Sequence, residues 1–464
     1  MNTSRQNAVK QQSESLWKEL RLIDLAFMQV LLVASPGWVG TAAKQGPTHI
    51  VFWFLALLLF FLPEALVVSR LSRSLPLEGG IYQWAKLALG PFAGFFAAWN
   101  FWFFIMLVWA TIGITAASNL SYIFGPSASW LASNTTVITV LNIIIFGLIW
   151  MVNVRGFRVS KWLTNIASTL TLSIFGTLIL LLLLRPGHSI NPSPPLFYLT
   201  MPQFSLLSVT LFSKMSFNAL GGLDNAAVFA GESKNPERDL SRSVSIAAPV
   251  IAVLYTLGTG AILAYVSPAN VDLIAPIPQV LSAAAGSSVV LGWLKVMIIL
   301  VSTVIFVTQT IVWFAAVSRL PMVAGWDGLM PAWFTALHPR FKTPVRSISF
   351  VVLCSLGLGM LSLLGVREQE AFQLIFTIAF ACAGIYYLVL FAIPLLGASA
   401  LSPRPTVLLQ LGALSGFVVT LLSIVCQLVP IVDVKHPLVF ATKVGCAVAV
   451  ANAVGVALYL RGKG

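Results

Sequence analysis

The chain contains 464 residues, of which 58% are hydrophobic and only 9% are charged. Soluble globular domains hold roughly a quarter charged residues, so this composition excludes an ordinary soluble enzyme, a disordered chain and a disulfide-stabilised scaffold. The net charge of +13 would suit a nucleic-acid-binding protein. Membrane proteins, however, collect Lys and Arg in their cytoplasmic loops for topological reasons, and we therefore expect no nucleic-acid partner.

Long apolar stretches recur along the whole chain. A helix needs about 20 mostly apolar residues to cross the hydrocarbon core of a bilayer, and twelve segments meet this requirement. In chain order they are 22–43, 49–69, 91–123, 136–153, 161–185, 204–231, 243–266, 291–318, 347–365, 371–396, 406–431 and 437–460. Residues 1–21 are polar and lack the short apolar stretch of a cleavable signal peptide, so we predict a cytoplasmic tail there.

The basic residues fall mainly on one side of these predicted spans. With the N-terminus inside, 20 of the 27 Lys and Arg residues lie in the tail or in cytoplasmic connections. Only Lys44, Arg185, Arg367 and Lys435 lie on the opposite side. This asymmetry predicts the orientation, and an even number of spans places both termini in the cytoplasm. We therefore expect a multi-pass protein of the cell membrane.

The first and sixth predicted spans contain residues that do not favour a continuous helix in lipid. The first carries Pro36, which cannot donate a backbone hydrogen bond, followed by Gly37. The sixth carries Gly221 and Gly222 directly before Leu223. Either feature alone is typical of a kink or of close helix packing. Breaks at corresponding positions of two five-span units are instead typical of inverted repeats that hold a substrate near the membrane midplane.

Several sequence motifs occur in the order found in one family of transporters. They lie at residues 20–24, 64, 69–82, 89–92, 153–156, 230–238, 318–319, 327–331 and 338–344. Through them the chain resembles the amino acid–polyamine–organocation (APC) superfamily, and amino acid permeases in particular. The resemblance covers essentially the whole chain. It implies an all-α polytopic membrane protein with twelve transmembrane helices: a five-plus-five inverted repeat with broken helices 1 and 6, plus two peripheral helices.

The implied organisation divides the chain into four parts. Residues 1–21 form the tail, 22–185 the first inverted repeat, 204–396 the second, and 406–464 the last two spans with a short cytoplasmic C-terminus. The resemblance also implies a permease that moves amino acids by alternating access. A polyamine or organic-cation carrier and an amino acid exchanger are the alternatives.

An amino acid carries a carboxylate and an ammonium, and both need partners away from bulk water. The restart of the first span offers free N–H groups and the positive end of a helix dipole to the carboxylate, while carbonyls before the sixth-span break suit the ammonium. Spans three, eight and ten are expected to add side-chain specificity. The predicted substrate-binding residues are Ala34, Ser35, Gly37, Trp38, Gly40, Phe217, Asn218, Ala219, Gly222, Asn100, Phe314 and Tyr386. For Trp38, a gating role and packing against lipid are both open.

Ionisable groups inside predicted spans are costly and therefore indicate function. Lys214 either neutralises Asp224, approaches a carboxylate, couples transport to protons, or snorkels to the surface. Asp224 lies at the sixth-span break, where a structural, gating or proton-binding role is expected. Glu64 is expected to pair with the backbone or with a cation near the cytoplasmic gate.

The coupling ion is not identified by any motif. Asn165 aligns with a position where some family members carry lysine, and Ser302 and Thr303 offer hydroxyls to Na⁺. Such hydroxyls also commonly bond to carbonyls of their own helix. Proton coupling, sodium coupling and exchange stay open. We expect no cofactor, H⁺ or Na⁺ as coupling ion, and a small-molecule substrate and the lipid bilayer as partners.

Two other classes of membrane protein compete with a transporter. A channel calls for rings of similar groups, usually from several subunits, which paired broken helices do not suggest. An enzyme calls for clustered catalytic or metal-binding groups, and the four His residues show no metal-ligand spacing. The sequence therefore predicts a transporter and not an enzyme.

Overall fold

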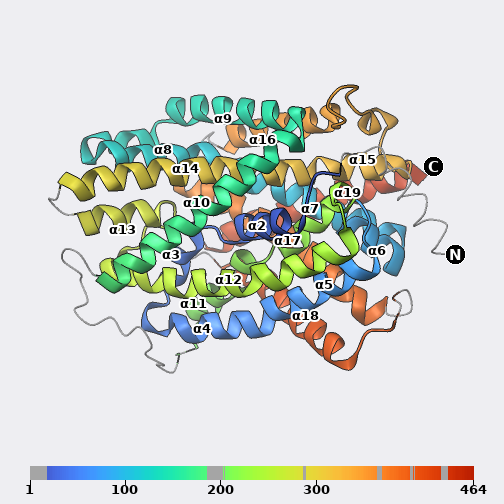
Figure 1. The fold of residues 1–464 in the computed structure, drawn as a ribbon, viewed down its shortest axis with the longest axis horizontal. Helices are drawn as coiled ribbons and strands as arrows, with labels where there is room; N and C mark the ends of the chain where they lie inside the picture. The colour runs from blue at the N-terminus through green and yellow to red at the C-terminus, as the bar shows by residue number, and fades with distance from the viewer. Residues whose placement is uncertain are drawn as a thin grey trace.

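The computed structural model describes residues 18–184, 202, 204–285, 289–362, 368–397, 401, 403–429 and 437–463. This part of the chain is almost entirely helical, and its β pairing is limited to an isolated bridge between Leu20 and Ser233. The long helices run roughly along the longest axis of the molecule (Figure 1).

The helices follow one another with short connections. Up to the end of the fifth predicted span they are α2 (Leu22–Val33), α3 (Gly37–Ala43), α4 (His49–Ala56), η2 (Leu57–Phe61), α5 (Leu62–Ser74), α6 (Ile81–Leu89), α7 (Pro91–Val108), α8 (Ile112–Phe124), α9 (Thr135–Arg155) and α10 (Phe157–Leu184). The rest of the chain forms α11 (Leu206–Ser213), η4 (Lys214–Ala219), η5 (Leu223–Glu232), α12 (Pro236–Tyr265), α13 (Pro276–Ala285), α14 (Val289–Val317), α15 (Arg319–Trp326), α16 (Val345–Ser362), α17 (Glu368–Leu396), α18 (Val407–Gln427) and α19 (Pro437–Lys463).

Not all of the twelve predicted spans are long uninterrupted helices. Among the described residues, nine helical stretches are long and apolar enough to cross a membrane, and the bent pair α2–α3 raises the number to ten. The sixth predicted span is divided into α11, the π-helical turn η4 and the 3₁₀ segment η5. The ninth corresponds to α16, whose apolar part, Val345–Leu361, is shorter than the other spans. The division into two repeats stays a prediction.

The helices turn apolar side chains outward and polar side chains inward, as expected for a protein surrounded by lipid. Helix α9 exposes Ile144 and Leu148, whereas its Asn142 is buried and accepts a hydrogen bond from the backbone N–H of Gly113 at 2.8 Å. In lipid every backbone polar group needs a partner within the protein. The described chain is thus a multi-pass membrane protein.

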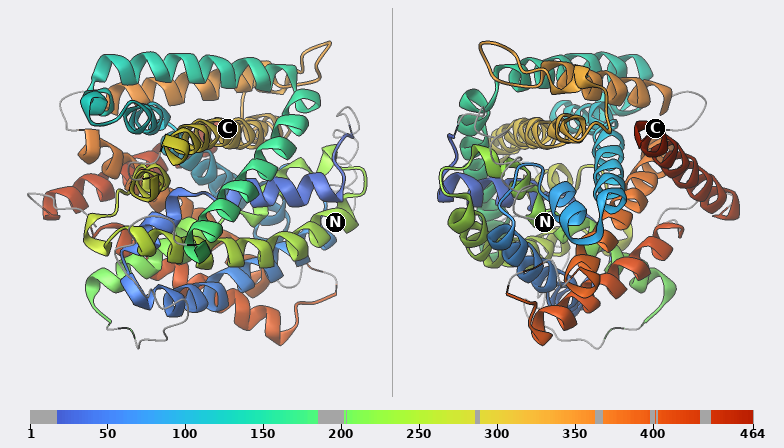
Figure 2. Two further views of the ribbon diagram at one scale, coloured as in Figure 1. Left: turned by 60° about the vertical axis from the view of Figure 1, so that its left-hand side comes forward. Right: turned by 90° about the vertical axis from the view of Figure 1, so that its right-hand side faces the viewer.

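The arrangement of the helices leaves the broken segments inside the bundle. Helix α2 packs against α10, α12 and α14, and α17 packs against α7 and α18. Helices α9 and α16 lie side by side along one edge, and α19 projects at the periphery (Figures 1 and 2). Helices α6 and α15 gather at one end of the molecule and α13 lies at the other (Figure 1). The ends are called the α15 end and the α13 end below.

Candidate functional site

The first break separates α2 from α3, which meet at an angle of 46°. It leaves the last carbonyls of α2 without partners in their own helix. Gln309 of α14 supplies donors: its side-chain Nε2 lies 2.7 Å from the oxygen of Leu31 and 3.2 Å from that of Leu32. The hydroxyl of Tyr255 of α12 donates to the carbonyl of Val33. Neutral side chains of two other helices therefore stabilise this break.

The second break lies between η4 and η5, at Gly221 and Gly222. Gly222 has φ +134°, a conformation that residues with a Cβ rarely adopt. The carboxylate of Glu64, on α5, accepts the backbone N–H groups of Gly222 at 3.0 Å and of Leu223 at 2.9 Å. A buried carboxylate thus caps the restart of the sixth span. Backbone pairing is one of the two roles predicted for this residue.

Tyr255 connects the two breaks. Its hydroxyl lies 3.0 Å from the carbonyl oxygen of Ala219 in η4 and accepts the backbone N–H of Ser35 at 3.2 Å. The ring stacks on that of Trp53, with centroids 4.9 Å apart and planes 10° from parallel. Trp53 in turn donates to the hydroxyl of Thr259 at 2.9 Å. One hydroxyl held by a stacked ring therefore fixes the spacing between the broken helices.

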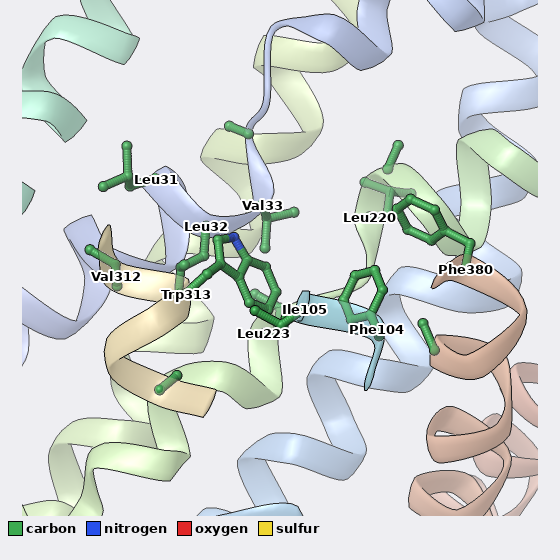
Figure 3. Close-up of a cluster of buried hydrophobic side chains, with 14 of the residues drawn as sticks. Leu31, Leu32, Val33, Phe104, Ile105, Leu220, Leu223, Val312, Trp313 and Phe380 are labelled. Atoms are coloured by element: carbon green, nitrogen blue, oxygen red, sulfur yellow. The ribbon is translucent and has the colours of Figure 1, made fainter. Parts of the chain in front are cut away.

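A cavity lies between the breaks, and its walls are mostly aromatic. The lining residues, by element, are Leu32, Val33, Ser35, Gly37, Trp38, Thr41, Phe104, Val108, Trp109, Thr111, Thr115, Lys214, Phe217, Asn218, Ala219, Gly221, Leu273, Ile274, Phe306, Gln309, Trp313, Gln373, Phe376, Phe380, Ala383, Tyr386 and Tyr387. Figure 3 shows the packed wall around it, with side chains of α2, α7, α14 and α17 converging near Leu220 and Leu223. Trp38 packs against Phe376 and Phe380, with ring centroids 5.7 and 5.4 Å away.

The cavity communicates with the α13 end only. A second cavity shares Leu273, Ile274 and Gln373 with the first and extends to Lys44 and Tyr122. Among the described residues, no corresponding cavity joins the first to the α15 end. The two ends of the site therefore differ.

The α15 end is closed by a buried ionic cluster. Arg319 Nε donates to Glu232 at 2.7 Å and lies 3.4 Å from the carboxylate of Glu78. Glu78 also accepts the backbone N–H of Gly231 at 2.8 Å. Burial and the neighbouring carboxylate of Glu232 raise the pKa of Glu78 to about 8, although Arg319 opposes the shift. Two acids that share one guanidinium thus join α15, the end of η5 and the loop after α5.

Lys214 lies on the cavity wall at the start of η4. It is 6% exposed, and its Nζ donates to Gln427 Oε1 of α18 at 3.1 Å. Gln427 Nε2 donates in turn to Asn218 Oδ1 at 2.9 Å. In the described part of the chain, no carboxylate lies within ion-pair distance of Lys214.

A second pair of buried ionisable groups lies behind the cavity. The hydroxyl of Tyr387 is 3.2 Å from Glu64 Oε1 and 3.2 Å from Asp224 Oδ1. Neither acid has a basic partner within 4.0 Å among the described residues. Tyr387 therefore joins two carboxyl groups without a countercharge.

The structure places the predicted substrate-binding residues in two groups. Seven line the cavity: Ser35, Gly37, Trp38, Phe217, Asn218, Ala219 and Tyr386. Five do not: Ala34, Gly40, Gly222, Asn100 and Phe314. Asn100 bonds to Asn452 of α19 at 2.8 Å, and Phe314 packs on Phe146 with centroids 5.7 Å apart. A Cβ on Gly40 would lie 2.5 Å from Pro276, so this glycine allows close packing of α13.

The predicted coupling residues are also dispersed. Asn165 lies away from the cavity and donates to Asp24 at 2.8 Å. The hydroxyl of Ser302 donates to the carbonyl of Ile298, and that of Thr303 donates to its own helix and accepts from Asn119 at 3.0 Å. These hydroxyls therefore already have protein partners.

Five residues of the site were not singled out by the sequence reasoning for the roles they have here. They are Tyr255, Gln309, Gln427, Tyr387 and Gly221. Gln309 and Gln427 carried a usable signal, because each is an amide inside a long apolar stretch. The partners of an isolated polar residue depend on which helices are neighbours, and its own span does not specify them.

Comparisons with known proteins bear on this arrangement. The profile of the amino acid permease family matches residues 20–459. An uncharacterized transporter of Legionella pneumophila is 26% identical, covering 81% of this chain and 80% of the relative. A probable agmatine/putrescine antiporter of Lactococcus lactis is 24% identical, covering 67% and 66%. The methylthioribose transporter of Bacillus subtilis is 25% identical, covering 76% and 77%. The cargo named for these relatives differs, so similarity alone does not select a substrate.

Proposed function

The chain belongs to the amino acid permease family and is a membrane transporter rather than an enzyme, and we propose that it is a secondary active transporter that moves amino acids by alternating access. In this proposal the chain forms twelve spans, five plus five in inverted repeats and two at the periphery. The observation that carries it is the cavity between two broken spans joined by Tyr255.

The breaks suit an amino acid because they gather backbone polar groups at membrane depth. Ser35 and Gly37 of the first break and Phe217 and Ala219 of the second line the same cavity. Irregular backbone at this depth is tolerated where it lines a cavity. A small zwitterion bound between them contacts both broken helices, so its binding is coupled to their relative position.

The difference between the two ends supports alternating access. The cavity extends toward the α13 end, and the Arg319 cluster closes the α15 end. We place both termini and the α15 end in the cytoplasm, because most Lys and Arg residues fall on that side. The structure then corresponds to an outward-facing state, and the Arg319 cluster must separate for release inside.

Protons are the coupling ion that the site favours. Glu64 and Asp224 share the hydroxyl of Tyr387, which has one hydrogen and so donates to one carboxyl group. The second contact is a hydrogen bond when the other carboxyl group carries a proton. Glu64 already accepts two backbone N–H groups, which leaves Asp224 as the protonated partner. The other ionisable side chain facing this pair is Tyr386, also on α17.

Transport by purified protein in liposomes tests the proposed function. We expect uptake of radiolabelled amino acids that an inward proton gradient stimulates and that a sodium gradient leaves unchanged. Asp224→Asn should remove the response to the proton gradient and preserve exchange of substrate across the membrane. Stimulation by sodium alone would overturn the assignment of the ion. Uptake of diamines without uptake of any amino acid would overturn the assignment of the substrate in favour of a polyamine carrier.

A further inference from the structure

The cavity wall carries a buried cation whose charge is not neutralised by the protein. Lys214 is the one Lys, Arg, Asp or Glu among the described residues that line the cavity. It is nine-tenths buried, yet its partner is the neutral amide of Gln427. A buried charge is costly unless it is paired, and both a carboxylate and water are missing from its protein contacts. The remaining place for a countercharge is the cavity itself.

The hydrogen-bond order around Lys214 determines which groups stay free. An ammonium only donates, so Gln427 presents its oxygen to Lys214 and its N–H₂ to Asn218. Asn218 therefore accepts with its oxygen. Its Nδ2 is buried without an acceptor in the described part of the chain, and Asn218 lines the cavity. Lys214 and Asn218 thus form a pair of donors from one element, η4, that lacks acceptors.

Another part of the wall has the opposite character. Gln309, whose N–H₂ is used at the first break, keeps its Oε1 buried without a donor among the described residues. It lies on α14, and it lines the cavity together with Ser35 and Gly37. An acceptor is therefore available near the first break, and donors accompany Lys214 on η4.

We propose that the cavity selects amino acids that carry a second carboxylate, which Lys214 and Asn218 bind directly. This inference rests on the proposed function and names its substrate class. The side-chain carboxylate of the substrate supplies the countercharge for Lys214 and an acceptor for Asn218 Nδ2. Charge-assisted hydrogen bonds of this kind are about twice as strong as neutral ones.

The same arrangement disfavours cationic substrates. A diamine or polyamine entering the cavity meets Lys214, and two positive charges in a partly desolvated site repel each other. The acids Glu64 and Asp224 are not among the residues that line the cavity. The cargo named for the agmatine/putrescine relative therefore does not fit this wall.

Equilibrium binding to the purified full chain tests the inference with three probes: glutamate, glutamine and glutarate. We expect the wild-type protein to bind glutamate at least tenfold more tightly than glutamine, and to bind glutarate, which lacks the ammonium, more weakly than glutamate. Lys214→Met should weaken glutamate binding at least tenfold and change glutamine binding less than threefold. Lys214→Arg should restore part of the preference. Lys443→Met, on the exposed face of α19, is the matched control and should change neither.

The outcomes separate this inference from the proposed function. Equal wild-type affinity for glutamate and glutamine would overturn the inference and leave an amino acid transporter. Equal weakening of both ligands by Lys214→Met would assign the lysine a structural role and overturn the inference as well. Binding of none of the common amino acids would overturn both. If Lys214→Met does not fold, the wild-type ratio of the two affinities decides.

Discussion

The two breaks are stabilised in opposite ways. At the first, the exposed groups are carbonyls that end α2, and neutral donors on Gln309 and Tyr255 satisfy them. At the second, the exposed groups are N–H groups that begin η5, and the carboxylate of Glu64 satisfies them. Because only the second partner ionises, only the second break responds directly to protonation. We infer that the first break serves mainly to hold substrate and the second also couples transport to the ion.

Removal of the carboxylate at the second break is expected to have the largest effect. Glu64→Ala leaves the buried N–H groups of Gly222 and Leu223 without acceptors, at about 1–3 kcal/mol each. We expect transport to fall at least about 100-fold and the unfolding temperature to drop. Glu64→Gln keeps an acceptor oxygen, so it should fold and lose only the proton dependence. Uptake assays and thermal unfolding of the two variants check this difference. Equal behaviour of Ala and Gln variants would show that capping is not the role of Glu64.

Removal of the link between the breaks should have a smaller effect. Tyr255→Phe keeps the ring stacked on Trp53 but removes the hydroxyl that contacts Ser35, Val33 and Ala219. We expect uptake to fall about tenfold, because both breaks lose one partner, each worth about 1 kcal/mol. Tyr265→Phe removes a hydroxyl from the same helix, bonded to Leu181 at 3.3 Å, and is the control. If both variants transport equally well, Tyr255 does not couple the breaks.

A third change, outside both breaks, concerns the closed end. The pKa of Glu78 is about 8 in the folded protein, against 4.5 for an ordinary glutamate. The folded state therefore holds a proton that the unfolded state releases. This contribution to stability is complete below about pH 4.5 and is lost as the pH rises through about 8. We expect the unfolding temperature of the wild type to fall between pH 6 and pH 9, and that of Glu78→Gln to fall less. Parallel curves would contradict the shared-proton interpretation of the Arg319 cluster.

The features that depend on local backbone chemistry were predictable from the sequence. Pro36 and the glycine pair at Gly221 mark both breaks, since neither continues a helix without cost. The membrane class and the permease family also follow from composition and motif order. The family profile and the all-helical structure confirm both.

The features that depend on helix neighbours were not predictable in the same way. Asn100 was assigned to the pocket as a polar residue of span three, but it faces Asn452 of α19. Tyr255 reads as an ordinary aromatic residue in span seven until α12 is seen between both breaks. A single sequence states which residues share a helix. It does not state which face of that helix meets which other helix, and the cavity is formed by such meetings.

The central claim is that the substrate binds between the two breaks, and Gly37 tests it most directly. A Cβ on Gly37 meets no atom within 4 Å, so a side chain there extends into the cavity without straining the fold. Gly147, on α9, is equally free of contacts and exposed on the outer face. Binding of the transported amino acid to purified Gly37→Leu and Gly147→Leu should be measured side by side. The account predicts at least a tenfold loss of affinity for Gly37→Leu and wild-type affinity for Gly147→Leu. Wild-type affinity in a folded Gly37→Leu variant would contradict it.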